Sequence, residues 1–319
     1  MAKMNLVQFQ PGMSMTQFMT RYGTQEQCEM ALEKCRWRDG FECPMCTHKG
    51  HYVVWHGKAK TFQCHACRSQ TTLTSGTIFH STKLPLTKWF QAMYFLTQSK
   101  NNVSALELMR LAGVCYRTAW RLKHKILEVM AEREASRQLE GHVQVDDAYL
   151  GGVHPGGKRG RGSPNKVPFI AAVQTSPEGR PLYAVFTKVK TFSKEEVKTW
   201  AGVHLAPAST VVSDGLGCFT GVKVVGATHD QSVVGTSRKS SSMLCFRWIN
   251  TVLSNLKTAT SGTYHSIDFN KYAFLYLAEA QYRFNRRFDL STILTRLLYA
   301  AVATGSRPEA WMRLAEDER

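Results

Sequence analysis

Three carboxylates stand in two short apolar runs of the chain. Asp146 and Asp147 lie inside the run VQVDDAYLGG, residues 143–152, and Asp214 ends the run VVSD. A carboxylate in an apolar, β-prone segment is costly unless a positive charge compensates it. Divalent cations of the magnesium class select carboxylate oxygens as ligands. We therefore expect Asp146 and Asp214 to bind magnesium.

Asp147 is a weaker candidate than its neighbour. Successive side chains of a strand point to opposite faces of the sheet, so Asp146 and Asp147 are expected on opposite faces. Asp147 is therefore not predicted to be a ligand.

A third candidate ligand comes from a predicted helix over residues 242–258. Asn250 offers a neutral amide oxygen, and Lys257 follows it at a spacing close to two helical turns, so both point to one side. Two divalent ions about 4 Å apart can activate an attacking oxygen and stabilise a leaving oxygen of a phosphodiester. Asn250 would complete such a magnesium site, and Lys257 would hold a phosphate oxygen. An Asn and a Lys at this spacing are also common by chance.

Two CxxC pairs predict a second metal site of a different kind. The cysteines are Cys43 and Cys46 in CPMC, and Cys64 and Cys67 in CHAC. Four thiolates at this spacing are typical of a zinc ribbon, with strands between the two pairs. Four ligands leave no open position, so we expect one structural zinc per chain. Four buried free thiols are the alternative.

A helix-turn-helix is predicted between residues 103 and 130. Gly113 and Val114 form the turn between the two helices. The second helix carries the basic residues Arg117, Arg121 and Lys125, together with Lys123 and His124. We expect this helix to lie in a groove of double-stranded DNA. An ordinary helical hairpin would show the same pattern.

The segment 152–166 is rich in glycine and basic residues. Lys158, Arg159 and Arg161 in the run GGKRGRG could follow a phosphate backbone. A solvated loop is the alternative, but the position directly after the acidic strand favours a DNA contact.

Composition agrees with a nucleic-acid partner. The 319 residues carry a formal net charge of +17, and the basic residues are scattered over the whole chain. An apolar content of 43% is sufficient for a real core. The chain shows no signal peptide and no membrane span, so we expect a soluble, cytoplasmic protein without a membrane partner. Nine cysteines in such a protein favour metal binding over disulfides.

These elements predict an α+β protein of several domains. The front part is expected to hold helices, a zinc ribbon and the helix-turn-helix. The back part is expected to hold a mixed central sheet flanked by helices. The expected segments are an N-terminal helical segment 1–38, a zinc ribbon 39–83, a DNA-binding region 84–133, a catalytic domain 141–290 and a helical tail 291–319.

The order of these motifs resembles bacterial insertion-sequence transposases, specifically the group with an N-terminal zinc ribbon and a DDE-type, RNase H-like catalytic domain. The resemblance covers about residues 14–290 and implies that Asp146 and Asp214 are the first two catalytic acids. The third acidic position falls on Asn250, and Lys257 matches the basic residue that follows it. The motifs that carry the resemblance are CPMC, CHAC, TAWRLKHKI, VQVDDAYLGG, GGKRGRG, VVSDG, WINTVLSNLK, GTYH and YRFNRRF.

The resemblance implies a transposase that binds the terminal inverted repeats of its element in the bacterial cytoplasm. It would cleave a strand with magnesium and join the freed end to target DNA. A homodimer or larger assembly would bring two ends together. One rival is a transposase-derived DNA-binding protein that has lost catalysis, because Asn250 leaves the site one negative charge short. A second rival is a nuclease acting on RNA or hybrids.

Overall fold

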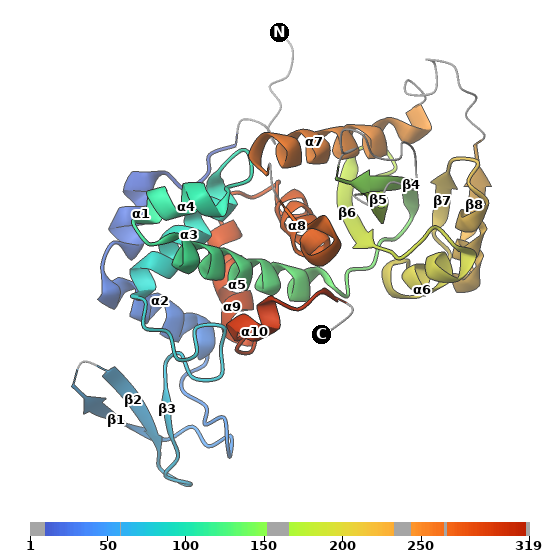
Figure 1. Cartoon of the computed structure of the whole chain (residues 1–319). Helices are drawn as coiled ribbons and strands as arrows, with labels where there is room; N and C mark the ends of the chain where they lie inside the picture. The colour runs from blue at the N-terminus through green and yellow to red at the C-terminus, as the bar shows by residue number, and fades with distance from the viewer. Residues whose placement is uncertain (1–9, 58, 152–165, 233–243, 265–266, 317–319) are drawn as a thin grey trace. The chain divides into compact units, whose positions relative to one another are not determined.

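The computed structural model describes residues 10–57, 59–151, 166–232, 244–264 and 267–316, which form two compact units. The first unit holds the described residues up to Val129 together with Phe288–Arg313. The second holds Met130–Arg287 and the described residues after Arg313. Figure 1 shows the helices and strands of both units.

The first unit begins with two helices that share one capping design. At the start of α1 (Met15–Tyr22), Ser14 and Gln17 form a reciprocal capping box, and Thr24 and Gln27 do the same for α2 (Gln25–Arg36). Each box satisfies backbone N–H groups that a helix start leaves without partners. A Ser or Thr followed three residues later by a Gln is the sequence signature of such a box.

A three-stranded antiparallel sheet follows, in the order β1 (His51–His56), β2 (Ala59–Cys64) and β3 (Gln70–Thr72). After β3 the chain makes turns from Leu73 to Ser81. Local hydrogen bonds replace a ladder there, since Thr77 Oγ1 donates to the carbonyl of Thr74 at 2.7 Å.

Helices complete the first unit. The helix α3 spans Leu86–Gln98, and the expected pair of helices is present as α4 (Ala105–Ala112) and α5 (Tyr116–Glu134). Gly113 ends α4 in the left-handed conformation with φ 62°, which glycine adopts without strain. The C-terminal helices are α9 (Ile293–Ala303) and α10 (Glu309–Met312).

The second unit is built on a mixed five-stranded sheet, in the order β6-β5-β4-β7-β8. The first three strands of that order are antiparallel, and β7 and β8 run parallel to β4. This sheet confirms the expected mixed architecture. Its strands are β4 (His142–Leu150), β5 (Val167–Thr175), β6 (Pro181–Lys188), β7 (Thr210–Ser213) and β8 (Thr228–Gln231).

Each face of this sheet has its own layer. Val143 and Val145 point to the layer of α6 (Lys194–His204) and the 3₁₀ helix η1 (Gly217–Val225). Ala148 and Leu150 point to the layer of α7 (Arg247–Thr263) and α8 (Phe269–Phe284). Helices therefore flank the sheet, and β4 is buried on both faces (Figure 1).

The outer edge of β6 is covered by amide side chains of α8. Asn285 accepts a hydrogen bond from the Ala184 N–H at 2.7 Å, and Gln281 accepts one from the Phe186 N–H at 2.9 Å. These bonds replace a missing neighbouring strand and protect the edge from pairing with another chain. Part of the motif YRFNRRF therefore has a structural role.

A buried ion pair joins the end of α5 to α8 within the same unit. Glu134 accepts from Arg286 at 2.6 Å, from Arg137 at 2.9 Å and from the Asn285 amide at 2.8 Å. Although burial opposes it, the charges of Arg286 and Arg137 keep the pKa of Glu134 below its usual value. No helix within the described ranges is long and apolar enough to cross a membrane.

Candidate active site

Three carboxylates converge where β4 and β7 separate. Asp146, Asp147 and Asp214 each offer an oxygen, and these oxygens lie within 4.8 Å of one another. The strand register explains part of this geometry. Val145 of β4 pairs with Ser213 of β7, and the residue after each of them is an aspartate. Two residues far apart in the sequence are thus brought together by a parallel strand pair.

Asp147 corrects the expectation from strand alternation. Its side chain was expected on the face opposite Asp146, away from the metal site, yet it belongs to the same acidic group. Beyond Val145, β4 keeps its pairing with β5 but has no partner on the β7 side. The Asp146 carboxylate also turns along the backbone and accepts a hydrogen bond from the Asp147 N–H at 2.9 Å. Both acids can therefore approach one point at the open edge.

The electrostatics of this group favour a cation. Burial, and then the negative charges of Asp147 and Asp214, raise the pKa of Asp146 to about 7. Lys257 acts in the opposite direction on Asp146. Three carboxylates this close repel one another unless positive charge is added, and their oxygens are the ligands of magnesium-class ions. The residues present therefore fit a divalent metal.

Asn250 lies in the first turn of α7 and is partly buried. That turn is anchored to the acidic strand, because Gln144 accepts hydrogen bonds from the N–H groups of Trp248 at 3.1 Å and Ile249 at 3.0 Å. Gln144 shares a strand face with Asp146, two residues away. Lys257 is exposed further along α7 and acts electrostatically on Asp146. Sequence reasoning missed Gln144, although a glutamine in an apolar strand was a visible signal.

Glu279 is another acidic residue of the second unit. It is fully buried on α8 and accepts a hydrogen bond from the Tyr264 hydroxyl at 2.8 Å. It is not one of the three carboxylates that converge in the described part of the chain. The Glu279 carboxylate is thus hydrogen-bonded to a buried tyrosine.

The four cysteines form a separate site in the ribbon. Their sulfurs lie within 4.8 Å of one another, and none is in a disulfide. The two CxxC pairs lie in separate turns with the same backbone conformation. The residue after each second cysteine is left-handed: Thr47 has φ 60°, and Arg68 has φ 61°. Ser69 hydrogen bonds to Cys43 and lowers its pKa to about 6, which favours the thiolate. Four sulfurs this close together, none of them in a disulfide, suit one structural zinc.

The basic residues of α5 are divided between surface and interior. Arg117 is exposed and pairs with Glu309 at 3.2 Å, and Arg121 pairs with the same carboxylate. Lys123 is fully buried and donates to the carbonyl of Val103 at 2.5 Å. His124 is buried as well, so these two residues, which were counted with the DNA-binding helix, face the protein interior.

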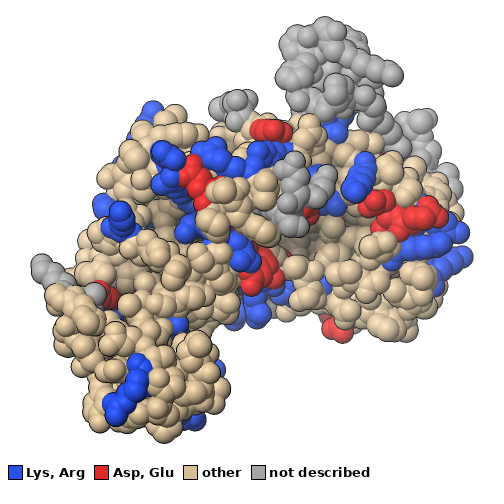
Figure 2. Space-filling view, turned by 60° about the horizontal axis from the view of Figure 1, so that its bottom comes forward, with Lys and Arg blue, Asp and Glu red and all other residues tan. Residues whose placement is uncertain are grey.

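Lys125 is partly buried and its ammonium lies 5.8 Å from the centre of the Trp89 ring. The remaining predicted DNA contacts, Lys158, Arg159 and Arg161, lie outside the described residues. Figure 2 shows Lys and Arg side chains spread over one face of the molecule instead of gathered in one patch.

Comparisons with known proteins agree with both sites. The chain matches the transposase zinc-ribbon domain over residues 23–70 and the ISXO2-like transposase domain over residues 138–285. These ranges contain the four cysteines and the three aspartates. An uncharacterized protein in transposable element ISH50 of Halobacterium salinarum is 32% identical over 123 residues. That similarity spans 37% of this chain and 40% of the ISH50 protein.

A four-cysteine ribbon followed by a mixed sheet with an acidic cluster defines the class as a transposase with a zinc ribbon and a DDE domain. The chain belongs to the ISXO2-like transposase family of the IS1595 group. The ISH50 relative is archaeal, so the family is not restricted to bacterial elements.

Proposed function

We propose that this protein is an active DNA transposase that cleaves the ends of its element and joins them to target DNA. The observation that carries the proposal is the convergence of Asp146, Asp147 and Asp214 at one point of the mixed sheet. The sheet order and the matched DDE domain support an RNase H-like catalytic domain.

The acidic residues would hold the metal, and the neighbouring residues would position the DNA. Asp146 and Asp214 are proposed as charged ligands of magnesium, with Asn250 as a neutral one, and Asp147 joins them as a candidate. Bound magnesium would supply a positive charge that activates water and stabilises the phosphate during displacement at phosphorus. Lys257 would hold a phosphate oxygen beside Asp146, in agreement with its electrostatic effect on that carboxylate.

The front half is proposed to recognise the terminal inverted repeats as double-stranded DNA. Support comes from α4 and α5 with their tight turn at Gly113, and from Arg117 and Arg121 at the exposed start of α5. Lys125 and the basic residues 158, 159 and 161 are proposed as further phosphate contacts. Two element ends must be held together, so the active form is proposed to be a dimer or a larger assembly.

The five segments expected from the sequence are retained as functional regions in this proposal. Residues 39–83 form the zinc ribbon, 84–133 the DNA-binding region and 141–290 the catalytic domain. The helical segments 1–38 and 291–319 flank them. This division follows function, whereas compactness groups the C-terminal helices with the front half.

A second function is favoured by one residue. Asn250 leaves the site with one charge fewer than three acids at the DDE positions would give, which would suit a DNA-binding protein that no longer cuts. Asp147 argues against this rival, because it supplies a third carboxylate to the cluster.

Strand cleavage separates the two functions. The substrate is duplex DNA taken from the boundary of the gene's element, with magnesium present, and the control is Asp214→Asn. An active transposase cuts and its Asp214→Asn variant only binds. The rival predicts that both proteins bind and neither cuts.

A further inference from the structure

A cavity of about 490 Å³ lies beside α5 within the first unit. It is enclosed by the loop 81–84, by Trp89 of α3 and by one side of α5. The α5 side chains recur at helical spacing, so they share one face. Those side chains are Thr118, Arg121, Leu122 and Lys125.

The charge of this cavity favours an anion. Lys83, Arg121 and Lys125 line it, and no acidic residue of the described chain does. Burial, followed by repulsion from Arg121, lowers the pKa of Lys125. The Nε of Arg121 is buried without a hydrogen-bond acceptor among the described residues. An anionic oxygen in the cavity would offset the repulsion between Lys125 and Arg121.

The rest of the lining suits more than a phosphate group. Leu84, Trp89 and Leu122 provide an apolar wall, and Ser81, Thr82 and Thr118 add residues with hydroxyl groups. Pockets that bind small organic molecules combine such apolar walls with a few polar groups, and their volumes start at about 300 Å³. A phosphate alone would leave most of the cavity empty.

We propose that this cavity binds one unpaired nucleotide of DNA, with its phosphate at Lys83, Arg121 and Lys125 and its base against the apolar wall. A paired base is held inside the duplex and cannot enter, whereas a base in a single-stranded extension can do so at little cost. The proposal rests on the proposed DNA-binding function of α5. It adds that the helix distinguishes unpaired from paired ends.

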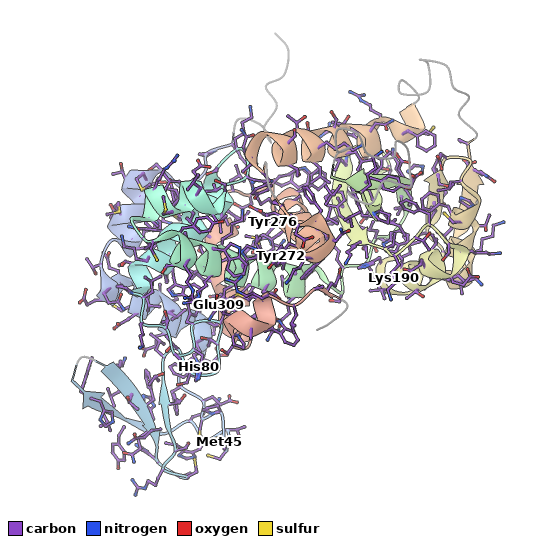
Figure 3. All side chains as sticks on the ribbon, in the orientation of Figure 1. Met45, His80, Lys190, Tyr272, Tyr276 and Glu309 are labelled. Carbon is purple, nitrogen blue, oxygen red and sulfur yellow. The ribbon has the colours of Figure 1, made fainter. Side chains whose placement is uncertain are left out.

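Glu309 competes with a ligand for one of these cations. Glu309, labelled in Figure 3, lies on α10 and pairs with Arg121 next to the cavity. It also pairs with Arg117, which does not line the cavity. A carboxylate therefore already occupies part of the positive surface where a phosphate would bind.

The test compares two fluorescent DNA probes on the full-length protein. One is a blunt duplex, and the other is the same duplex with a short single-stranded extension. We expect the extended probe to bind about tenfold more tightly, from the contribution of one buried base. Equal affinity for both probes would overturn the proposal while leaving duplex binding intact. Binding to neither probe would overturn the proposed DNA-binding function together with it.

Two variants locate the effect in the cavity. Thr118→Phe fills the cavity and should abolish the preference for the extended probe, whereas the matched control Thr118→Ser should keep it. Lys83→Ala removes an exposed cavity cation with little risk to folding and should reduce the preference. Arg117 lies outside the cavity, so Arg117→Ala should reduce the affinity for both probes equally. If Thr118→Phe and Lys83→Ala both keep the wild-type preference for the extended probe over the blunt duplex, the proposal is wrong.

Discussion

Gln144 Oε1 accepts a hydrogen bond from the backbone N–H of Ile249 at 3.0 Å, and this bond ties the start of α7 to β4. The same oxygen accepts from the Trp248 N–H, at a helix start where Phe246 offers no side-chain cap. Free N–H groups at a helix start need such partners. The strand that carries Asp146 therefore also fixes the turn that carries Asn250.

Gln144→Leu should loosen that turn without removing any proposed ligand. Two buried N–H groups lose their acceptor, so we expect the free energy of unfolding to fall by about 1–3 kcal/mol. Magnesium-dependent cleavage should need more magnesium, because Asn250 is held less firmly. Gln144→Glu keeps an acceptor oxygen and serves as the control. Unfolding in urea and cleavage against magnesium concentration measure the two effects, and a variant like wild type in both would refute this role.

The raised pKa of Asp146 makes stability depend on pH. Its pKa is about 7 in the folded protein against an ordinary value of 3.8, so the folded state binds the proton more tightly. The stability associated with this group is present at low pH and is lost as pH rises through about 7. Without magnesium, Asp146→Asn should therefore stabilise the protein more at about pH 8 than at about pH 5. Thermal unfolding of both proteins at the two pH values measures the stabilisation by Asp146→Asn. The same stabilisation at both pH values would contradict the raised pKa of Asp146.

The ribbon should hold one zinc. Cys64→Ser removes one of four thiolates and should release the metal and unfold residues 39–80, because zinc binding and ribbon folding are coupled. The back half should remain folded. Cys245→Ser removes a cysteine outside the four-sulfur group and is the control. Metal analysis of the purified proteins should give about one zinc for wild type and the control. A zinc-free wild type with an intact ribbon would overturn this expectation.

Glu309 should weaken DNA binding by neutralising the start of α5. Its carboxylate pairs with Arg117, Arg121 and Arg313, so Glu309→Gln frees positive charge for phosphates. Exposed ion pairs are worth little, so we expect affinity for duplex DNA to rise by at most about fivefold. Asp289→Asn is the matched control, because Asp289 pairs with Arg296 of α9 instead. Fluorescence anisotropy measures the DNA affinity of both variants. If the affinity of Glu309→Gln is lower than or equal to that of wild type, Glu309 does not weaken DNA binding.

Local patterns predicted much of the fold, because they depend on neighbouring residues. The spacing of Cys43 and Cys46 defines a metal-binding turn without any knowledge of the rest of the chain. The contact between Arg117 and Glu309 joins residues 192 positions apart, and α10 is too short to leave a periodic pattern. Alternation holds along β4, since Val145 and Ala148 face opposite layers, but it did not exclude Asp147 from the acidic group, because β4 has no partner on the β7 side beyond Val145.

Polarity alone also misled at Lys123. A lysine on a basic helix was counted with the DNA-binding residues, but its ammonium is buried and donates a hydrogen bond to the carbonyl of Val103. Only the packing around α5 decides which of its cations reach solvent.

Strand cleavage against magnesium concentration tests the central claim most directly. The DNA is a duplex from the element boundary, and the proteins are wild type, Asp146→Asn, Asp214→Asn, Asn250→Ala and Asn250→Asp. We expect wild type to cut, both aspartate variants to bind without cutting, and Asn250→Ala to cut only at high magnesium. Asn250→Asp restores the missing charge and should cut at lower magnesium than wild type. Cleavage by Asp146→Asn or Asp214→Asn at the wild-type rate would contradict the assignment of this acidic cluster as the catalytic centre.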